Sequence, residues 1–439
     1  MATRPRDDVC VPAHADGGIV RARVHRIHPT KPQNPGMCRG VRAWETWRGK
    51  ARGEKPGEKP SFPHPIVGRH AEESTMADDA TAGKLFGREK ITDATAALFT
   101  ESANKIPDER FIRTKEVQTA GAVVREEEML ELPVVDMASL VDPDSSASET
   151  AKLGSACREW GFFQEAAIHQ MKESAAQFFS SPLESKNTVG VRDGFQGFGH
   201  HFNGGSSEKL DWAECLLLIT RPVQDRNMDL WPETNPPTFR HALDRYSVEI
   251  TSLARRLLGF MATDLGVSQE ALLGAFFAGT GNENDKGQSM SMHHYPPCRH
   301  PDKVLGIAPH TDTLGLTILL HVDDTPGLQV RRGGTWFPVR PLPGALVVNV
   351  GDILDVLTNG AYVSVEHRVV PDAERGRTTV AMFQDACVQG LVTPLPELLL
   401  VGGDARAQAR YRSIPKLDYR NGSITALAQG TRFADSLRM

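Results

Sequence analysis

The stretch VLGIAPHTDTLGLTILL, residues 304–320, decides the fold class that the sequence predicts. Two short apolar runs flank a His-x-Asp pair, His310 and Asp312. From about residue 288 to residue 384, similar short runs rich in β-branched residues alternate with Gly, Pro, Asn and Asp, as strands joined by turns do. Several short strands at even spacing after a helical half indicate a closed or double-sheet β architecture.

His310 and Asp312 are a candidate metal-binding pair. In an extended chain, residues i and i+2 point to the same face, so both side chains can address one ion. His367 lies 55 residues beyond Asp312, in another predicted strand, 363–370. Two histidines and one carboxylate are the set that non-haem Fe(II) oxygenases use, and no nearby cysteine indicates structural zinc. Because an isolated His-x-Asp is more often a surface pair or a core histidine, the interpretation depends on the joint pattern.

Arg377 and Thr379 are candidates for binding a carboxylate. The alternation of an extended chain places this guanidinium and hydroxyl on one side, where both can donate hydrogen bonds. Tyr295, in HHYPPC at 293–298, carries a phenol that could reach the same carboxylate, and the two prolines keep the adjoining chain extended. The alternatives are a surface arginine at a polar turn and a tyrosine of the core.

Composition restricts the class of protein and its partners. The 439 residues carry a net charge of −5, and the six cysteines show no C-x-x-C spacing, which favours a reducing, cytoplasmic setting. No apolar run approaches the roughly 20 residues that cross a bilayer. We therefore expect a monomer with a small-molecule substrate and with neither nucleic acid nor membrane as a partner.

The first 75 residues differ from the rest. Through Lys59 they hold 13 Lys and Arg against 6 Asp and Glu, with many Gly and Pro, so we expect a disordered extension. A transit peptide is the alternative, although no Ser precedes Ser61, and Met76 is an alternative start. Further along, apolar residues recur at steps of three and four over 238–265, which predicts an amphipathic helix.

Many motifs in one order resemble the plant 2-oxoglutarate- and Fe(II)-dependent dioxygenases. The resemblance covers about residues 104–425 and is strongest to the branch of senescence-related proteins, norcoclaurine synthase-like enzymes and O-demethylases. The motifs that carry it are LPVVDMASL (132–140), ACREWGFFQ (156–164), KLDWAE (209–214), HHYPPC (293–298), VLGIAPHTD (304–312), GLTILL (315–320), GLQVR (327–331), W-x-PV-x-PLPGALVVNVGD (336–352), SVEHRVV (364–370) and R-x-T (377–379).

The resemblance implies a fold, a reaction and a site. The implied fold is a double-stranded β-helix (jelly roll) with flanking helices: a mostly helical region over 76–285, a catalytic domain over 286–425 and a tail over 426–439. His310, Asp312 and His367 would bind Fe(II), while Arg377, Thr379 and Tyr295 would bind the distal carboxylate of 2-oxoglutarate. O₂ would be consumed, succinate and CO₂ released, and the substrate hydroxylated or O-demethylated. Ascorbate would serve as reductant.

The chain departs from the family pattern at three places. Thr379 replaces a serine, which keeps the hydroxyl, and His293 replaces an asparagine that often lines the cosubstrate pocket but can still hydrogen-bond there. After Gln164 about seven to ten residues with an Asn-His-Gly strand are missing by family analogy, which would expose a neighbouring strand edge. The alternatives are therefore an ascorbate-dependent oxidase, a defunct binding protein and, remotely, a zinc hydrolase.

The substrate pocket is less visible in the sequence. Phe198, Leu217, Phe383 and residues 391–400 are candidates to line it, and each is as readily explained as ordinary core. Such pockets are mostly apolar, so we expect a hydrophobic small molecule of specialised metabolism or a hormone.

Overall fold

The computed structural model describes residues 88–101, 107–119, 122–123, 132–159, 162–163, 169–192, 194–201, 209–233, 238–277, 287–400 and 408–439. Three expectations lie outside these residues: the extension over residues 1–75, the alternative start at Met76 and the shortened segment that follows Gln164.

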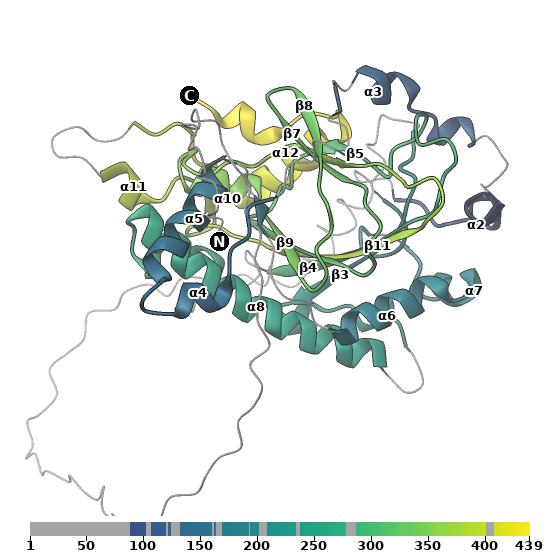
Figure 1. Ribbon diagram of the computed structural model, residues 1–439, viewed down its shortest axis with the longest axis horizontal. Coiled ribbons are helices and arrows are strands. Elements are labelled where there is room, and N and C mark those ends of the chain that lie inside the picture. The colour runs from purple at the N-terminus through teal and green to yellow at the C-terminus, as the bar shows by residue number, and fades with distance from the viewer. Residues whose placement is uncertain are drawn as a thin grey trace, which may run out of the picture.

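A seven-stranded antiparallel sheet forms the larger half of the β core (Figure 1). Its strand order is β1-β9-β6-β11-β4-β3-β2, so β11 lies in the centre. The strands that form this sheet are β1 (Phe162–Phe163), β2 (Gly197–His200), β3 (Glu214–Arg221), β4 (Gln288–Tyr295), β6 (Leu316–His321), β9 (Leu346–Val350) and β11 (Arg377–Gln384). Nearly every residue of these strands whose burial is described is buried, as expected for a sheet covered on both faces.

A four-stranded sheet faces the larger one. Its order is β5-β10-β7-β8, and it is formed by β5 (Ile307–His310), β7 (Leu328–Arg332), β8 (Thr335–Pro338) and β10 (His367–Val369). Side chains of both sheets line one cavity between them. A short pair, β12 (Leu391–Val392) and β13 (Ile414–Pro415), stands apart. The jelly roll that the sequence predicted is confirmed.

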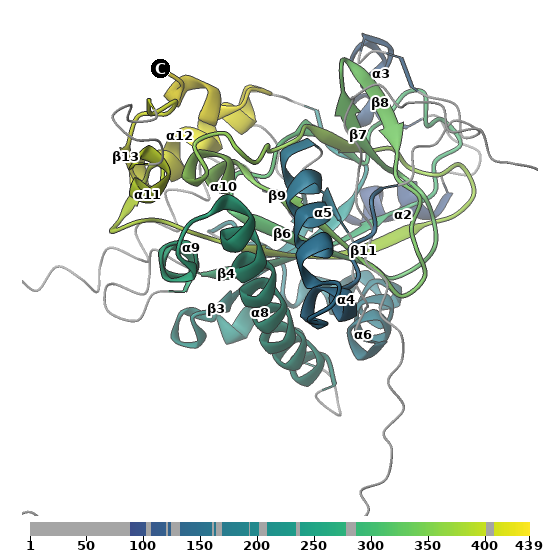
Figure 2. The same ribbon diagram turned by 60° about the vertical axis from the view of Figure 1, so that its left-hand side comes forward.

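Helices cover the outer face of the larger sheet. The longest, α8 (Thr238–Leu265), has the predicted bounds, and it packs against β11 and β3, with α5 and α9 beside it (Figure 2). The predicted stripe is its buried face, including Phe239, Leu243, Ile250 and Leu257. The other α-helices are α2 (Asp93–Glu101), α3 (Thr114–Thr119), α4 (Met137–Val141), α5 (Ser146–Glu159), α6 (His169–Ser180), α7 (Leu183–Asn187), α9 (Gln269–Phe276), α10 (Asp352–Leu357), α11 (Pro396–Leu400) and α12 (Lys416–Ala428).

Short 3₁₀ helices join these elements. They are η1 (Glu109–Phe111), η3 (Val223–Asp225), η4 (Met228–Leu230) and η6 (Phe433–Leu437). No helix among the described residues combines the length and apolar character needed to cross a membrane.

Two details differ from the sequence prediction. The strand expected from Leu132 is not formed, since only Val134 makes a single bridge there before α4 begins. Strands were predicted only after about residue 288, yet β2 and β3 precede that point and extend the larger sheet past β4. The region before residue 288 therefore supplies part of the β core as well as the covering helices.

Candidate active site

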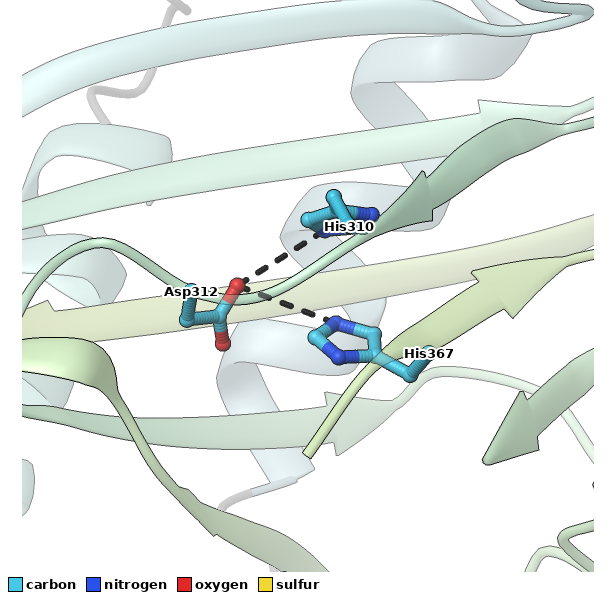
Figure 3. A group of neighbouring side chains, drawn as sticks. All are labelled: His310, Asp312 and His367. Atoms are coloured by element: carbon cyan, nitrogen blue, oxygen red, sulfur yellow. Dashed lines mark ion pairs between the residues drawn. The ribbon is translucent and has the colours of Figure 1, made fainter. Parts of the chain in front are cut away.

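Strand register brings the two candidate histidines together. His310 ends β5 and His367 begins β10, and these antiparallel strands pair His367 directly with His310. Side chains opposite each other in such a pair lie about 5 Å apart at Cβ, so 57 residues of sequence separation close to contact distance. Asp312 follows β5 by two residues and turns back toward both rings (Figure 3).

The ligand atoms of this trio converge on one point. The Nε2 atoms of His310 and His367 each lie 3.7 Å from Oδ1 of Asp312, and one ligand atom from each residue falls within 4.8 Å of the others. Nδ1 of His310 is 2.8 Å from the Ala308 carbonyl oxygen, and Nδ1 of His367 is 3.2 Å from that of Val365. With Nδ1 protonated toward these carbonyls, both Nε2 lone pairs face a carboxylate oxygen, and a cation between them removes the repulsion. The donor set fits Fe(II).

Two polar side chains orient the Asp312 carboxylate. Thr317 Oγ1 donates to Oδ2 at 2.5 Å and Asn349 Nδ2 donates to the same oxygen at 2.6 Å. Burial alone would raise the pKa of Asp312, but the neighbouring imidazoles and these two hydrogen bonds outweigh it and lower that pKa. Burial and the neighbouring His367 lower the pKa of His310, so its ring stays neutral and can ligate. Neither Thr317 nor Asn349 was singled out in the sequence.

The four predicted cosubstrate residues form two adjacent cross-strand pairs. On the central strand β11, Arg377 pairs with Tyr295 of β4, and Thr379 pairs with His293. All four side chains line the cavity that holds the metal trio, whose volume is about 360 Å³. This volume lies within the range of small-molecule sites.

Arg377 is a buried cation without a conventional partner. Its side chain is 1% exposed, and none of its three guanidinium nitrogens has a hydrogen-bond acceptor in the described part of the chain. Its Cζ lies 5.1 Å from the centroid of the Tyr295 ring, a cation–π contact that compensates only part of the lost hydration. A carboxylate in the cavity would supply the missing counter-charge.

His293 completes this end of the cavity. Its ring stacks on Tyr295 with centroids 5.7 Å apart, and its Nε2 lies 3.3 Å from Ser291 Oγ. Burial, together with the nearby histidines and cations, lowers the pKa of His293 well below its usual value. The ring is therefore neutral at physiological pH and can accept or donate one hydrogen bond.

The predicted substrate-pocket residues divide. Leu217 and Phe383 line the cavity, whereas Phe198 does not. Phe198 pairs with Leu216, and Leu217 pairs with Gly197, so Phe198 points to the opposite face of the sheet, where it packs edge-on against Phe178. The choice of Phe198 is corrected, because a shift of one residue along a strand reverses the face. Residues 391–400 do not line the cavity either.

A face of α12 forms the wall that the sequence did not reveal. Its cavity-lining residues recur at steps of three and four and are Lys416, Tyr419, Arg420, Ser423, Ile424 and Leu427. The helix is anchored by a Lys416–Asp385 ion pair and by the Tyr419 hydroxyl, which donates to the Thr313 carbonyl at 2.9 Å. The spacing could have indicated a helix, but no local signal shows which residues it faces.

Comparisons with known proteins agree with this geometry. The family model of the 2OG-Fe(II) oxygenase superfamily matches residues 286–386, and that described as non-haem dioxygenase in morphine synthesis N-terminal matches residues 132–234. Protein SRG1 of Arabidopsis thaliana is 37% identical over 71% of this chain and 86% of its own length. The chain belongs to the 2OG-Fe(II) oxygenase superfamily.

Two further members of this superfamily are similar. Oxoglutarate-dependent flavonoid 7-O-demethylase 1 of Ocimum basilicum is 36% identical over 71% of this chain and 82% of its own length. The crystal structure of JOX2 in complex with 2OG, Fe and JA superposes with a TM-score of 0.65 at 28% identity, covering 80% of this chain and 98% of that one. The predicted family, fold and enzyme class are confirmed: this 2OG-Fe(II) oxygenase is an oxidoreductase that uses Fe(II) and 2-oxoglutarate.

Proposed function

We propose that His310, Asp312 and His367 bind the Fe(II) of this oxygenase. The observation that carries the proposal is the convergence of their ligand atoms within 4.8 Å, in the same cavity as the partnerless guanidinium of Arg377. Three protein ligands on one face leave open positions for a cosubstrate and O₂.

Arg377 then holds the distal carboxylate of 2-oxoglutarate, with Thr379, Tyr295 and His293 around it. A guanidinium offers several donors in a fixed plane, which suits a carboxylate, and burial strengthens each charge-assisted hydrogen bond. Because Arg377 is in the central strand, β4 and β6 hold the backbone of β11 from both sides. The cosubstrate is thereby placed in one orientation.

The substrate is a hydrophobic small molecule of specialised metabolism or a hormone, which the enzyme hydroxylates or O-demethylates. Bound Fe(II) supplies the oxidation, in which 2-oxoglutarate and O₂ become succinate and CO₂ and one oxygen atom enters the substrate. Leu217, Ile219, Leu319 and Phe383 give the cavity an apolar lining that accepts such a molecule and limits water. The names of the relatives, which include a flavonoid demethylase, support this class.

We also propose a cytoplasmic monomer that needs no nucleic acid and no membrane partner. The net charge of −5 and the absence of C-x-x-C spacing in the sequence support this setting.

Succinate formation tests the ligand assignment. Purified enzyme would be given Fe(II), ascorbate, 2-oxoglutarate and a panel of apolar plant metabolites, and succinate would be measured. Asp312→Ala is expected to abolish succinate formation, while Asp324→Ala serves as the control because its side chain is 82% exposed and pairs with Arg375. Iron-dependent turnover by Asp312→Ala would refute the assignment. Oxidation by the wild type that needs ascorbate but no 2-oxoglutarate would favour the oxidase alternative.

A further inference from the structure

Arg432 bridges two buried carboxylates of α10. Its Nε donates to Oδ1 of Asp352 and its Nη2 donates to Oδ2 of Asp355, both at 2.8 Å. The two aspartates are 1% and 2% exposed. A third, weaker contact joins Nη1 to Asp435, whose side chain is 56% exposed. Arg432 belongs neither to the metal trio nor to the residues that line the main cavity.

Asp352 leads directly to the first two candidate ligands. Thr311 Oγ1 donates to Oδ2 of Asp352 at 3.0 Å, and the backbone N–H of Asp352 donates to the carbonyl oxygen of Asp312 at 2.7 Å. Thr311 stands between His310 and Asp312 in the sequence. The position of this carboxylate therefore sets the position of the segment that carries both ligands.

Asp355 leads to the third ligand. Its Oδ2 accepts from the backbone N–H of Ser364 at 3.1 Å, and its Oδ1 accepts from the Tyr411 hydroxyl at 2.8 Å. Ser364 lies three residues before His367 and enters β10. One guanidinium thus connects, through two carboxylates, the two separate chain segments that meet at the metal trio.

We infer that Arg432 is a positioning residue for the metal centre. Two buried carboxylates one helical turn apart repel each other, and Arg432 is the cation that joins them. A second cavity of about 290 Å³ borders His310, Thr311, Asp352, Ser364 and Arg432, so these groups have space to move when the bridge is lost. The inference rests on the ligand set proposed above, and its effect falls on metal affinity.

The test is the dissociation constant for Mn(II), measured by calorimetry on the full chain in the absence of 2-oxoglutarate. Arg432→Gln is expected to weaken Mn(II) binding about 10-fold, the lower end of what loss of outer-shell support costs. Arg438→Gln is the matched control, because Arg438 also pairs with Asp435 but the structure shows no bond from it to either α10 carboxylate. Arg432→Lys keeps the charge without the planar fork and should restore only part of the affinity.

A double-mutant cycle separates positioning from general stability. Thr311→Val removes the hydroxyl that contacts Asp352, and its effect on the Mn(II) constant should not add to that of Arg432→Gln. If Arg432→Gln fails to fold, Thr311→Val alone carries the test and should weaken binding several-fold. Wild-type affinity in Arg432→Gln, or in Thr311→Val in that case, overturns the inference. A wild-type protein that does not bind Mn(II) refutes the ligand set itself, and the inference with it.

Discussion

Asn349 donates a 2.6 Å hydrogen bond to the Asp312 carboxylate oxygen that faces away from the two imidazoles. Thr317 contacts the same oxygen, Oδ2, while Oδ1 remains 3.7 Å from both Nε2 atoms. The carboxylate is therefore held by one oxygen and offers the other to the metal.

Loss of the Asn349 amide should weaken the metal centre. Asn349→Ala removes one of the two donors that orient Asp312, and removal of such support typically costs 10- to 100-fold in metal affinity. The Mn(II) dissociation constant is the measurement, with Asn421→Ala on the exposed side of α12 as control. An affinity equal to that of the control would show that Thr317 alone orients the carboxylate.

Arg377→Gln should act on the cosubstrate. It removes a charged hydrogen bond worth about 1.5–3 kcal/mol, so the KM for 2-oxoglutarate should rise roughly 10- to 100-fold. The matched control is Arg375→Gln, two residues away, since the Arg375 side chain is 52% exposed and pairs with Asp324. Equal KM values for the two variants would contradict the role given to Arg377.

Phe198 should matter for stability and not for cosubstrate use. Its ring is fully buried against Phe178, so Phe198→Ala should lower the free energy of unfolding by about 3–5 kcal/mol and leave the KM for 2-oxoglutarate unchanged. Phe383→Ala, at a cavity-lining position, should cost less stability and change substrate oxidation. Urea unfolding and succinate assays make the comparison, and a reversal of these two effects would place Phe198 in the pocket after all.

Acid should destabilise the protein through His200. Burial lowers the pKa of this ring to about 4 from the usual 6.5, so below pH 6.5 the unfolded chain takes up a proton that the folded chain refuses. The contribution to the free energy of unfolding falls by about 2 kcal/mol between pH 7 and pH 5. His200→Gln should lose less stability over this interval in urea titrations. His169→Gln, with a side chain 83% exposed, should behave like the wild type; identical pH profiles for all three would contradict the assignment.

The sequence predicted the site where a local rule was sufficient. Alternation placed His310 with Asp312, and Arg377 with Thr379, because these pairs lie in or directly after single strands. Asn349 escaped notice although it is a polar residue within the apolar run LVVNV, which is the one available signal that its side chain has a buried partner. Its role depends on the pairing of β9 with β6, and nothing in either strand alone specifies that register.

Tertiary placement explains the remaining errors. Phe198 was misplaced because the face of β2 is set by its pairing with β3, and the wall formed by α12 was missed because a helix carries no sign of what it will cover. β2 and β3 were missed for a similar reason, since they join a sheet whose other members come later in the chain or, like β1, are only two residues long.

The division of the cavity between a central strand and a helix has an evolutionary consequence. Substitutions on the exposed tips of α12 can reshape the substrate wall without touching β11, whose ladder of hydrogen bonds on both sides fixes Arg377. New substrates can therefore be acquired by drift on one helix while the fuel of the reaction is kept, which suits a lineage whose members include enzymes named for flavonoid and codeine demethylation.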